Sequence, residues 1–287
     1  MRRVMRRVWI VFVAYCLMNA SSWVLPVATT RQRGEALVAA GATALLLLVL
    51  RREPRQREWS AASRAALFCL LMMAVPGWLL EWAGRYLADG WSVAALTCVP
   101  LVVALAQAGP SDQQLRACAL AIAALLLVLP LPLPGGSMAW LAAGVVALAV
   151  LLVGLSAGPV YRSLQGVQYG SVLGLAAVGK GLLLLAADQM APSAGSIPGT
   201  AGQAVVGCAV EVLGLALLVW LAGRVVPVRL AARFLLVPWL TIVEGYAVVR
   251  EGLTWRLAVA LVLLGVATWQ ALQPGREEAP ALSLRAD

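Results

Sequence analysis

Two residues of opposite charge, Lys180 and Glu211, each stand inside a long apolar stretch of the sequence. A charged side chain within a membrane-spanning helix is costly, so it usually faces the protein interior and packs, binds substrate or carries protons there. Because the two stretches would run in opposite directions, we expect both charges at a similar depth, within about two helical turns. The sequence therefore predicts that the two side chains can meet.

A contact between the Lys180 and Glu211 side chains has two chemical interpretations. In the first, Lys180 and Glu211 form a buried ion pair that only fixes the packing of two helices. In the second, Glu211 is a proton carrier or a partner for a substrate ammonium group, and Lys180 anchors a substrate carboxylate or phosphate. An ion pair would hold the Glu211 carboxylate in its charged form, so pairing and proton transfer compete. Both interpretations stay open at the level of the sequence.

Further polar and aromatic residues occupy similar apolar stretches. Gln203 lies on the helical face of Glu211, and Tyr169 lies on that of Lys180. The first apolar stretch of the chain has a polar face that includes Tyr15, Asn19 and Trp23. This face either lines a cavity or forms hydrogen bonds between helices. Glu244 is either a gate residue or an interfacial one. The predicted substrate-binding residues are Tyr15, Asn19, Trp23, Trp78, Tyr169, Lys180, Gln203, Glu211 and Glu244, of which Glu211 is also the candidate for proton coupling.

The sequence offers no metal-binding or enzymatic motif. It has no histidine, and its five cysteines all fall within apolar stretches, without the spacing of metal ligands or disulfides. No clustered nucleophile and base and no phosphate-binding loop occur. The net charge of +9 lies in short loops, a distribution that sets membrane orientation and does not indicate nucleic-acid binding. We therefore predict no metal, no cofactor, no enzymatic activity and no nucleic-acid partner.

Composition and the apolar stretches indicate the fold class. The chain of 287 residues is 62% hydrophobic and 12% charged, whereas a soluble domain carries about 25% charged residues. Apolar runs of roughly 18–25 residues can span a bilayer as helices, and they lack the alternation of barrel strands. The sequence predicts an all-α polytopic membrane protein. The ten expected helices cover residues 8–27, 35–50, 65–87, 93–106, 115–131, 138–157, 163–187, 201–221, 230–249 and 255–272.

A repeated pattern divides the chain into two halves. Ala83-Gly84-Arg85 and Pro100 reappear about 140 residues later as Ala222-Gly223-Arg224 and Pro238, with the same spacing to within one residue. A duplication of this kind predicts two similar halves. With five helices in each, the halves would be inverted repeats, an arrangement typical of secondary transporters.

The arginines predict the orientation of the chain. Sixteen fall at the termini and in even-numbered loops, Arg233 among them, and five fall in odd-numbered loops, Arg33 among them. This bias places both termini in the cytoplasm. The high Arg-to-Lys ratio suggests a GC-rich bacterial genome, so we expect the bacterial inner membrane. The linker PLPLPGGS separates a first repeat, residues 1–135, from a second, residues 136–273, and residues 274–287 form a polar cytoplasmic tail.

The carboxy-terminal stretch resembles the EamA-type drug/metabolite transporter superfamily. The matching features are Pro238, the turn Arg250-Glu251-Gly252-Leu253-Thr254 and the helix end Gly265-Val266-Ala267. In the first half, SVAALTCVPLVVAL resembles the fourth helix of the same family. The resemblance implies ten helices with both ends inside, and a cavity between helices one, three, four, six, eight and nine. Members carry amino acids, nucleotide-linked compounds, drugs and other small metabolites, mostly outward.

These observations predict a secondary transporter that moves a small polar or amphipathic metabolite by alternating access. Export and proton coupling follow from the resemblance and from Glu211, respectively. One alternative is a flippase for a lipid-linked, polyprenyl phosphate-type substrate. Another is a non-transporting assembly partner, which would have a packed centre without a cavity around Glu211. The expected partners are the lipid bilayer and a small-molecule or lipid-linked substrate, with the protein a monomer or a homodimer.

Overall fold

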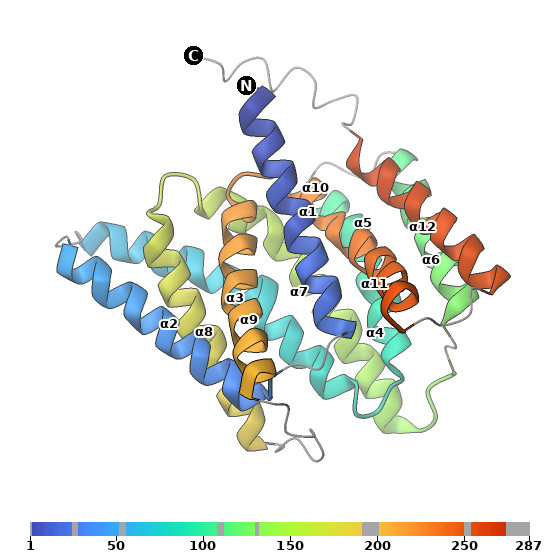
Figure 1. Cartoon of the computed structure of the whole chain (residues 1–287), viewed down its shortest axis with the longest axis horizontal. Helices are drawn as coiled ribbons and strands as arrows, with labels where there is room; N and C mark the ends of the chain where they lie inside the picture. The colour runs from blue at the N-terminus through green and yellow to red at the C-terminus, as the bar shows by residue number, and fades with distance from the viewer. Residues whose placement is uncertain are drawn as a thin grey trace.

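The computed structural model describes residues 2–24, 28–51, 56–107, 112–129, 132–190, 201–249 and 254–273. Within these residues the regular structure is entirely helical (Figure 1). The helices are α1 (Arg2–Val24), α2 (Thr30–Arg51), α3 (Gln56–Ala83), α4 (Asp89–Leu96), α5 (Val99–Gln107), α6 (Asp112–Val128), α7 (Ser137–Ser163), α8 (Tyr169–Met190), α9 (Ala201–Ala222), α10 (Pro227–Ala231), α11 (Arg233–Val249) and α12 (Trp255–Leu272).

Seven segments of the described residues are long and apolar enough to cross a membrane. They are Thr30–Leu50, Glu58–Ala83, Gly90–Gln107, Ser137–Ser163, Tyr169–Gln189, Ala201–Ala222 and Trp255–Leu272, and Arg7–Ser21 is a shorter apolar segment. Helices of this length satisfy their own backbone hydrogen bonds within hydrocarbon. The predicted class, an all-α polytopic membrane protein, is confirmed.

Several predicted helix bounds were wrong. The helix expected over 163–187 begins only at Tyr169, because α7 continues to Ser163. Between them lies a turn in which Gly166 has φ +81°, a conformation that suits glycine. The helices expected over 93–106 and 230–249 are each interrupted, as α4 and α5 in one case and α10 and α11 in the other.

Both Ala-Gly-Arg stretches end a long helix. α3 ends at Ala83 and α9 at Ala222, and each is followed by a turn and an interrupted helix. In the two turns Arg85 N donates to Trp82 O (3.3 Å), and Arg224 N donates to Leu221 O (2.9 Å). The prolines do not match as closely, since Pro100 is the second residue of α5 and Pro238 the sixth of α11. The shared feature is the interruption and not the proline.

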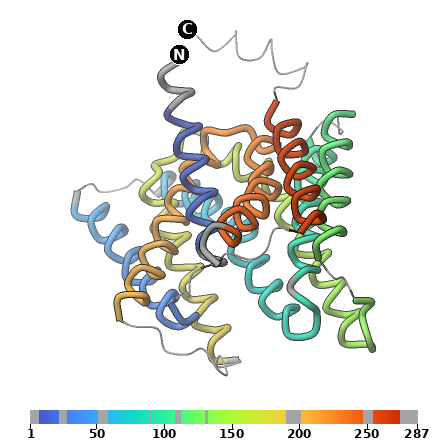
Figure 2. Tube along the Cα trace, turned by 45° about the vertical axis from the view of Figure 1, so that its right-hand side comes forward, coloured from blue at the N-terminus to red at the C-terminus, as the bar shows by residue number. Residues whose placement is uncertain are grey.

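The helices pack in a regular pattern. α3 contacts α7 and α8, and α9 contacts α1 and α2; α5 contacts α7, and α11 contacts α1. Figure 2 shows α6 and α12 together at one edge of the bundle, with α2, α8 and α9 at the opposite edge. The start of α1 and the end of α12 lie on the same side of the bundle in both views (Figures 1 and 2).

Glycines allow α2 and α8 to lie against each other. A Cβ added at Gly41 would lie 2.7 Å from the backbone oxygen of Gly174, and one at Gly181 would lie 2.7 Å from that of Gly34. No real side chain tolerates such distances, so the two backbones touch at both points. Small residues at a helix crossing permit this close approach in membranes. The crossing fixes α2 and α8 relative to each other, and with them the residues next to these glycines.

Candidate functional site in the bundle interior

An ion-pair cluster joins α2, α8 and α9. Lys180 Nζ donates to Glu211 Oε1, and Arg33 Nη1 lies 3.7 Å from Glu211 Oε2. The side chains of Lys180, Glu211 and Arg33 are 21%, 18% and 28% exposed. Lys180 and Glu211 therefore do contact each other, as their similar depth predicted. Arg33 is a second cation beside the same carboxylate.

The glycine crossing explains how three helices bring these charges together. Arg33 directly precedes Gly34 on α2, and Lys180 directly precedes Gly181 on α8, so both cations stand beside the same point of contact. α9 contacts both helices, and Glu211 lies halfway along it. Arg33 Nη2 also donates to Thr30 Oγ1 (3.4 Å), which orients the guanidinium within the first turn of α2.

A small cavity, here called the polar cavity, adjoins this cluster. It measures about 150 Å³, and the cluster lines it together with residues of α1, α3 and α9. Tyr15 and Asn19 form the α1 part of the wall, with Asn19 Nδ2 3.5 Å from the Tyr15 hydroxyl. Four of the predicted residues, Tyr15, Asn19, Lys180 and Glu211, therefore share one cavity.

A larger cavity, the central cavity, lies against the polar one. It measures about 430 Å³ and shares Tyr15, Asn19 and Lys180 with the polar cavity. The rest of its wall is mainly apolar and comes from both halves of the chain, including α3, α4 and α6 from the first half and α7, α9 and α11 from the second. Its volume is within the range of small-molecule sites, about 300–1,000 Å³. An interior space lined by both polar and apolar groups suits an amphipathic ligand.

Arg233, the first residue of α11, is the most deeply buried charge at the central cavity. It is 5% exposed, and its Nη1 has no hydrogen-bond partner among the residues that the structure describes. The Arg233 guanidinium carbon lies 4.6 Å from the centre of the Phe234 ring and 5.9 Å from that of Tyr15. No ion pair joins Arg233 to a carboxylate within the described residues. In the described part of the chain, this permanently charged and buried group thus contacts aromatic rings instead of a carboxylate.

The other predicted residues lie elsewhere. Trp78, Gln203 and Glu244 line neither interior cavity, and Gln203 is exposed. Tyr169 stands at the start of α8, where Arg224 lies 5.7 Å from its ring centre, so it belongs to the turns between helices. The side chain of Trp23 lies outside the described residues.

Arg33 and Arg233 were missed because both were counted as loop residues. α2 begins at Thr30 instead of residue 35, which brings Arg33 into the helix. The short helix α10 begins at Pro227 and ends at Ala231, so Arg233 follows a helix and begins the next one instead of lying in a loop. The available signal was the apolar character of Val225–Val228 and Leu230–Ala232, which flank Arg229 and separate Arg233 from Arg224.

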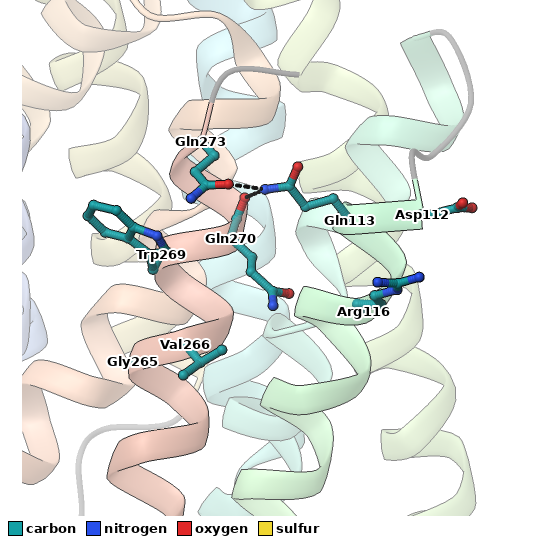
Figure 3. Close-up of a pocket in the computed structure, with 8 residues that line it drawn as sticks. All are labelled: Asp112, Gln113, Arg116, Gly265, Val266, Trp269, Gln270 and Gln273. Atoms are coloured by element: carbon teal, nitrogen blue, oxygen red, sulfur yellow. Dashed lines mark hydrogen bonds between the residues drawn. The ribbon is translucent and has the colours of Figure 1, made fainter. Parts of the chain in front are cut away.

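A third hollow, an open groove of about 580 Å³, lies between α6 and α12. Gln113 Nε2 donates across it to Gln270 O (2.9 Å) and to Gln273 Oε1 (2.8 Å). Figure 3 shows Gln113 reaching towards α12, while Asp112 and Arg116 point away from it. Although this groove has the larger volume, it lies between two helices at the edge of the bundle. The two interior cavities are therefore the better candidate site.

Comparison with known proteins defines the fold. No family model matches the chain, and no curated protein matches it. Among 22 matching chains of solved structures, one crystal structure aligns with 93% of this chain and 97% of its own length. The TM-score of that alignment is 0.65, and the sequence identity is 14%. A likeness at this identity shows that the chain shares an overall fold with that protein.

Proposed function

We propose that this chain is a secondary membrane carrier of the drug/metabolite transporter type, with two inverted five-helix halves around a central substrate site. The observation that carries the proposal is the central cavity, because residues of both halves line it. Transporters built from inverted repeats bind substrate near the middle of the membrane, between the repeats.

The helix contacts support two related halves. If α1, α2 and α3 correspond to α7, α8 and α9, the contact of α3 with α7 corresponds to that of α9 with α1. In the same way, the contact of α3 with α8 corresponds to that of α9 with α2, and that of α5 with α7 to that of α11 with α1. The pairs α2–α8 and α6–α12 then lie on the axis that relates the halves. The Ala-Gly-Arg turns after α3 and α9 support the same correspondence.

Two further observations support a carrier. An assembly partner was expected to have a packed centre around Glu211, whereas Glu211 lines a cavity. The start of α1 and the end of α12 lie on one side of the bundle, as an even number of crossings requires (Figure 1). We place both ends in the cytoplasm of a bacterial inner membrane, because the arginine bias still holds once the interior Arg33 and Arg233 are left out of the count.

Glu211 is the carboxylate available for proton coupling in this proposal. Lys180 contacts one of its carboxylate oxygens and Arg33 lies 3.7 Å from the other, so protonation requires the cluster to open. Opening between α9 and the α2–α8 pair would thus link proton uptake to a change in the shape of the polar cavity. A carrier whose pH dependence persists unchanged in Glu211→Gln would contradict this role.

Alternating access can be tested without knowing the substrate. Thr241 lines the central cavity, and cysteine replaces it with little change of volume. In a variant lacking the five native cysteines, Thr241→Cys should react with a membrane-impermeant thiol reagent in both right-side-out and inside-out vesicles. The control, Gln165→Cys in the exposed α7–α8 turn, should react from one side only. Labelling of Thr241→Cys from a single side would contradict the carrier.

A further inference from the structure

We propose that Arg233 is the anion-binding residue of this carrier, and that the molecule carried is an amphipath with a carboxylate or phosphate head group. This inference rests on the proposed function and names the substrate class of the same central cavity. In this proposal Arg233, and not Lys180, is the anchor for a substrate anion, because the Lys180 ammonium group already donates to Glu211.

The charge balance of the interior favours an anion. Among the residues that line the two cavities there are three cations, Arg33, Lys180 and Arg233, and one carboxylate, Glu211. One carboxylate for three cations leaves a surplus of two positive charges. Glu211 is shared by Arg33 and Lys180, and Arg233 has no carboxylate partner within the described residues. An isolated buried charge is strongly unfavourable unless a counter-charge or hydrogen bonds satisfy it. A bound anion would satisfy it.

Within the described residues, the surroundings of Arg233 leave its Nη1 free for a ligand. The guanidinium is planar, and its carbon lies 4.6 Å from the centre of the Phe234 ring and 5.9 Å from that of the Tyr15 ring. Its N–H groups point outward within that plane, in the fork geometry that matches carboxylate and phosphate oxygens. The unpartnered Nη1 is one of them. Arg233 also begins α11, and helix amino termini favour negative charge.

The rest of the central cavity wall determines the size and polarity of the ligand body that fits beside the anionic head group. Apolar side chains such as Met72, Leu218 and Val237 line the same cavity as Arg233, and Thr241 of α11 adds a hydroxyl group to its wall. The Thr241 hydroxyl donates to its own helix, at Val237 O (3.0 Å). A ligand therefore meets the unpaired Arg233 at one point, a few polar groups where the central cavity adjoins the polar one, and apolar surface over most of its body. A cavity of about 430 Å³ holds a medium-sized amphipath, whereas a long prenyl chain would have to extend outside it.

The test is ligand-dependent thermal stability of the full chain in nanodiscs of zwitterionic lipid. Three probes share an eight-carbon body and differ only in head group: octanoate, octanamide and octylamine. A ligand that binds the folded state raises its apparent stability by mass action. Octanoate should stabilise the wild type, while the amide and the amine should not. Arg233→Gln should bind octanoate at least tenfold more weakly, which equals about 1.4 kcal/mol.

Further variants keep the result interpretable. Arg162→Gln removes an exposed arginine at the end of α7 and should bind octanoate like the wild type. Arg233→Lys keeps the charge without the fork and should bind with intermediate affinity. If Arg233→Gln does not fold, Arg233→Met is tested instead, because the flexible apolar side chain of methionine suits the mainly apolar central cavity. Equal binding of octanoate and octanamide, or unchanged binding in the Arg233 variants, would overturn the proposal.

Two additional probes distinguish the sources of the anion. Stabilisation by octanoate or octyl phosphate that depends on Arg233 identifies a soluble amphipathic anion. Stabilisation by farnesyl phosphate alone, with the same dependence, identifies a lipid-linked phosphate and moves the carrier to the flippase class. No stabilisation by any of the three anions would overturn the inference. Since Thr241→Cys labelling needs no ligand, it can fail while Arg233-dependent binding succeeds, and the inference and the carrier proposal are then judged separately.

Discussion

Two cations in the interior of this protein, Lys180 and Arg233, have opposite surroundings. Lys180 faces a carboxylate from the next helix, and the glycine crossing of α2 and α8 holds it in place. Arg233 faces two aromatic rings and a cavity, and within the described ranges its Nη1 has no hydrogen-bond partner. A paired buried charge contributes to the specificity of packing, while an unpaired one is retained for something that binds. In the closed cluster the first region thus holds helices together, with Glu211 open to protonation only when the cluster opens, and the second region is the proposed site of ligand binding.

The largest expected effect comes from breaking the paired region. Glu211→Gln leaves the Lys180 ammonium without its carboxylate, and loss of one partner of a buried pair destabilises by about 3–5 kcal/mol. Glu211 is 18% exposed, so little of this loss is screened by solvent. Thermal unfolding of the purified variant should show a markedly lower midpoint than that of the wild type.

The double variant Lys180→Met, Glu211→Gln is the control for that measurement. It removes both charges, so no uncompensated ammonium remains, and it should recover more than half of the stability lost in Glu211→Gln. If the double variant is no more stable than the single one, the charges do not stabilise each other, and the structural role of the pair is refuted.

A smaller effect is expected from the crossing that positions the paired region. Gly41→Ala places a methyl group 2.7 Å from the backbone oxygen of Gly174, and such overpacking costs about 1–3 kcal/mol. Gly77→Ala is the matched control, since a Cβ at Gly77 meets nothing within 4 Å and alanine favours a helix. The unfolding midpoint should fall for Gly41→Ala only. Equal midpoints would mean that α2 and α8 do not touch through their glycines.

The smallest effect on stability is expected in the unpaired region. Arg233→Met loses the contacts of the guanidinium with Phe234 and Tyr15 but also removes an uncompensated buried charge, so its stability should stay within about 1 kcal/mol of the wild type. The ligand-free protein should therefore unfold near the wild-type midpoint. A loss as large as that of Glu211→Gln would show that Arg233 has a structural partner, and the contrast between the two cations would fail.

The sequence predicts the paired region better than the unpaired one. Lys180 and Glu211 interrupt long apolar stretches, so their interior position and their similar depth follow from helical geometry. Arg233 falls near the start of the helix expected over 230–249, but its closeness to Arg224 and Arg229 led us to count it with the loop before that helix. The apolar residues around Arg229 indicated an earlier helix start, whereas no local pattern shows that the Arg233 guanidinium carbon lies 5.9 Å from the centre of the Tyr15 ring. Contacts between helices decide that position, as they decide the part Arg33 takes in the cluster.

The most direct test of the contrast is octanoate binding measured side by side in Arg233→Gln and in the double variant Lys180→Met, Glu211→Gln. If Arg233 binds the anion and the Lys180–Glu211 pair does not, the double variant binds octanoate within about twofold of the wild type, and Arg233→Gln binds it at least tenfold more weakly. The opposite result, loss of binding in the double variant and wild-type affinity in Arg233→Gln, would place the anion at Lys180 and contradict the account.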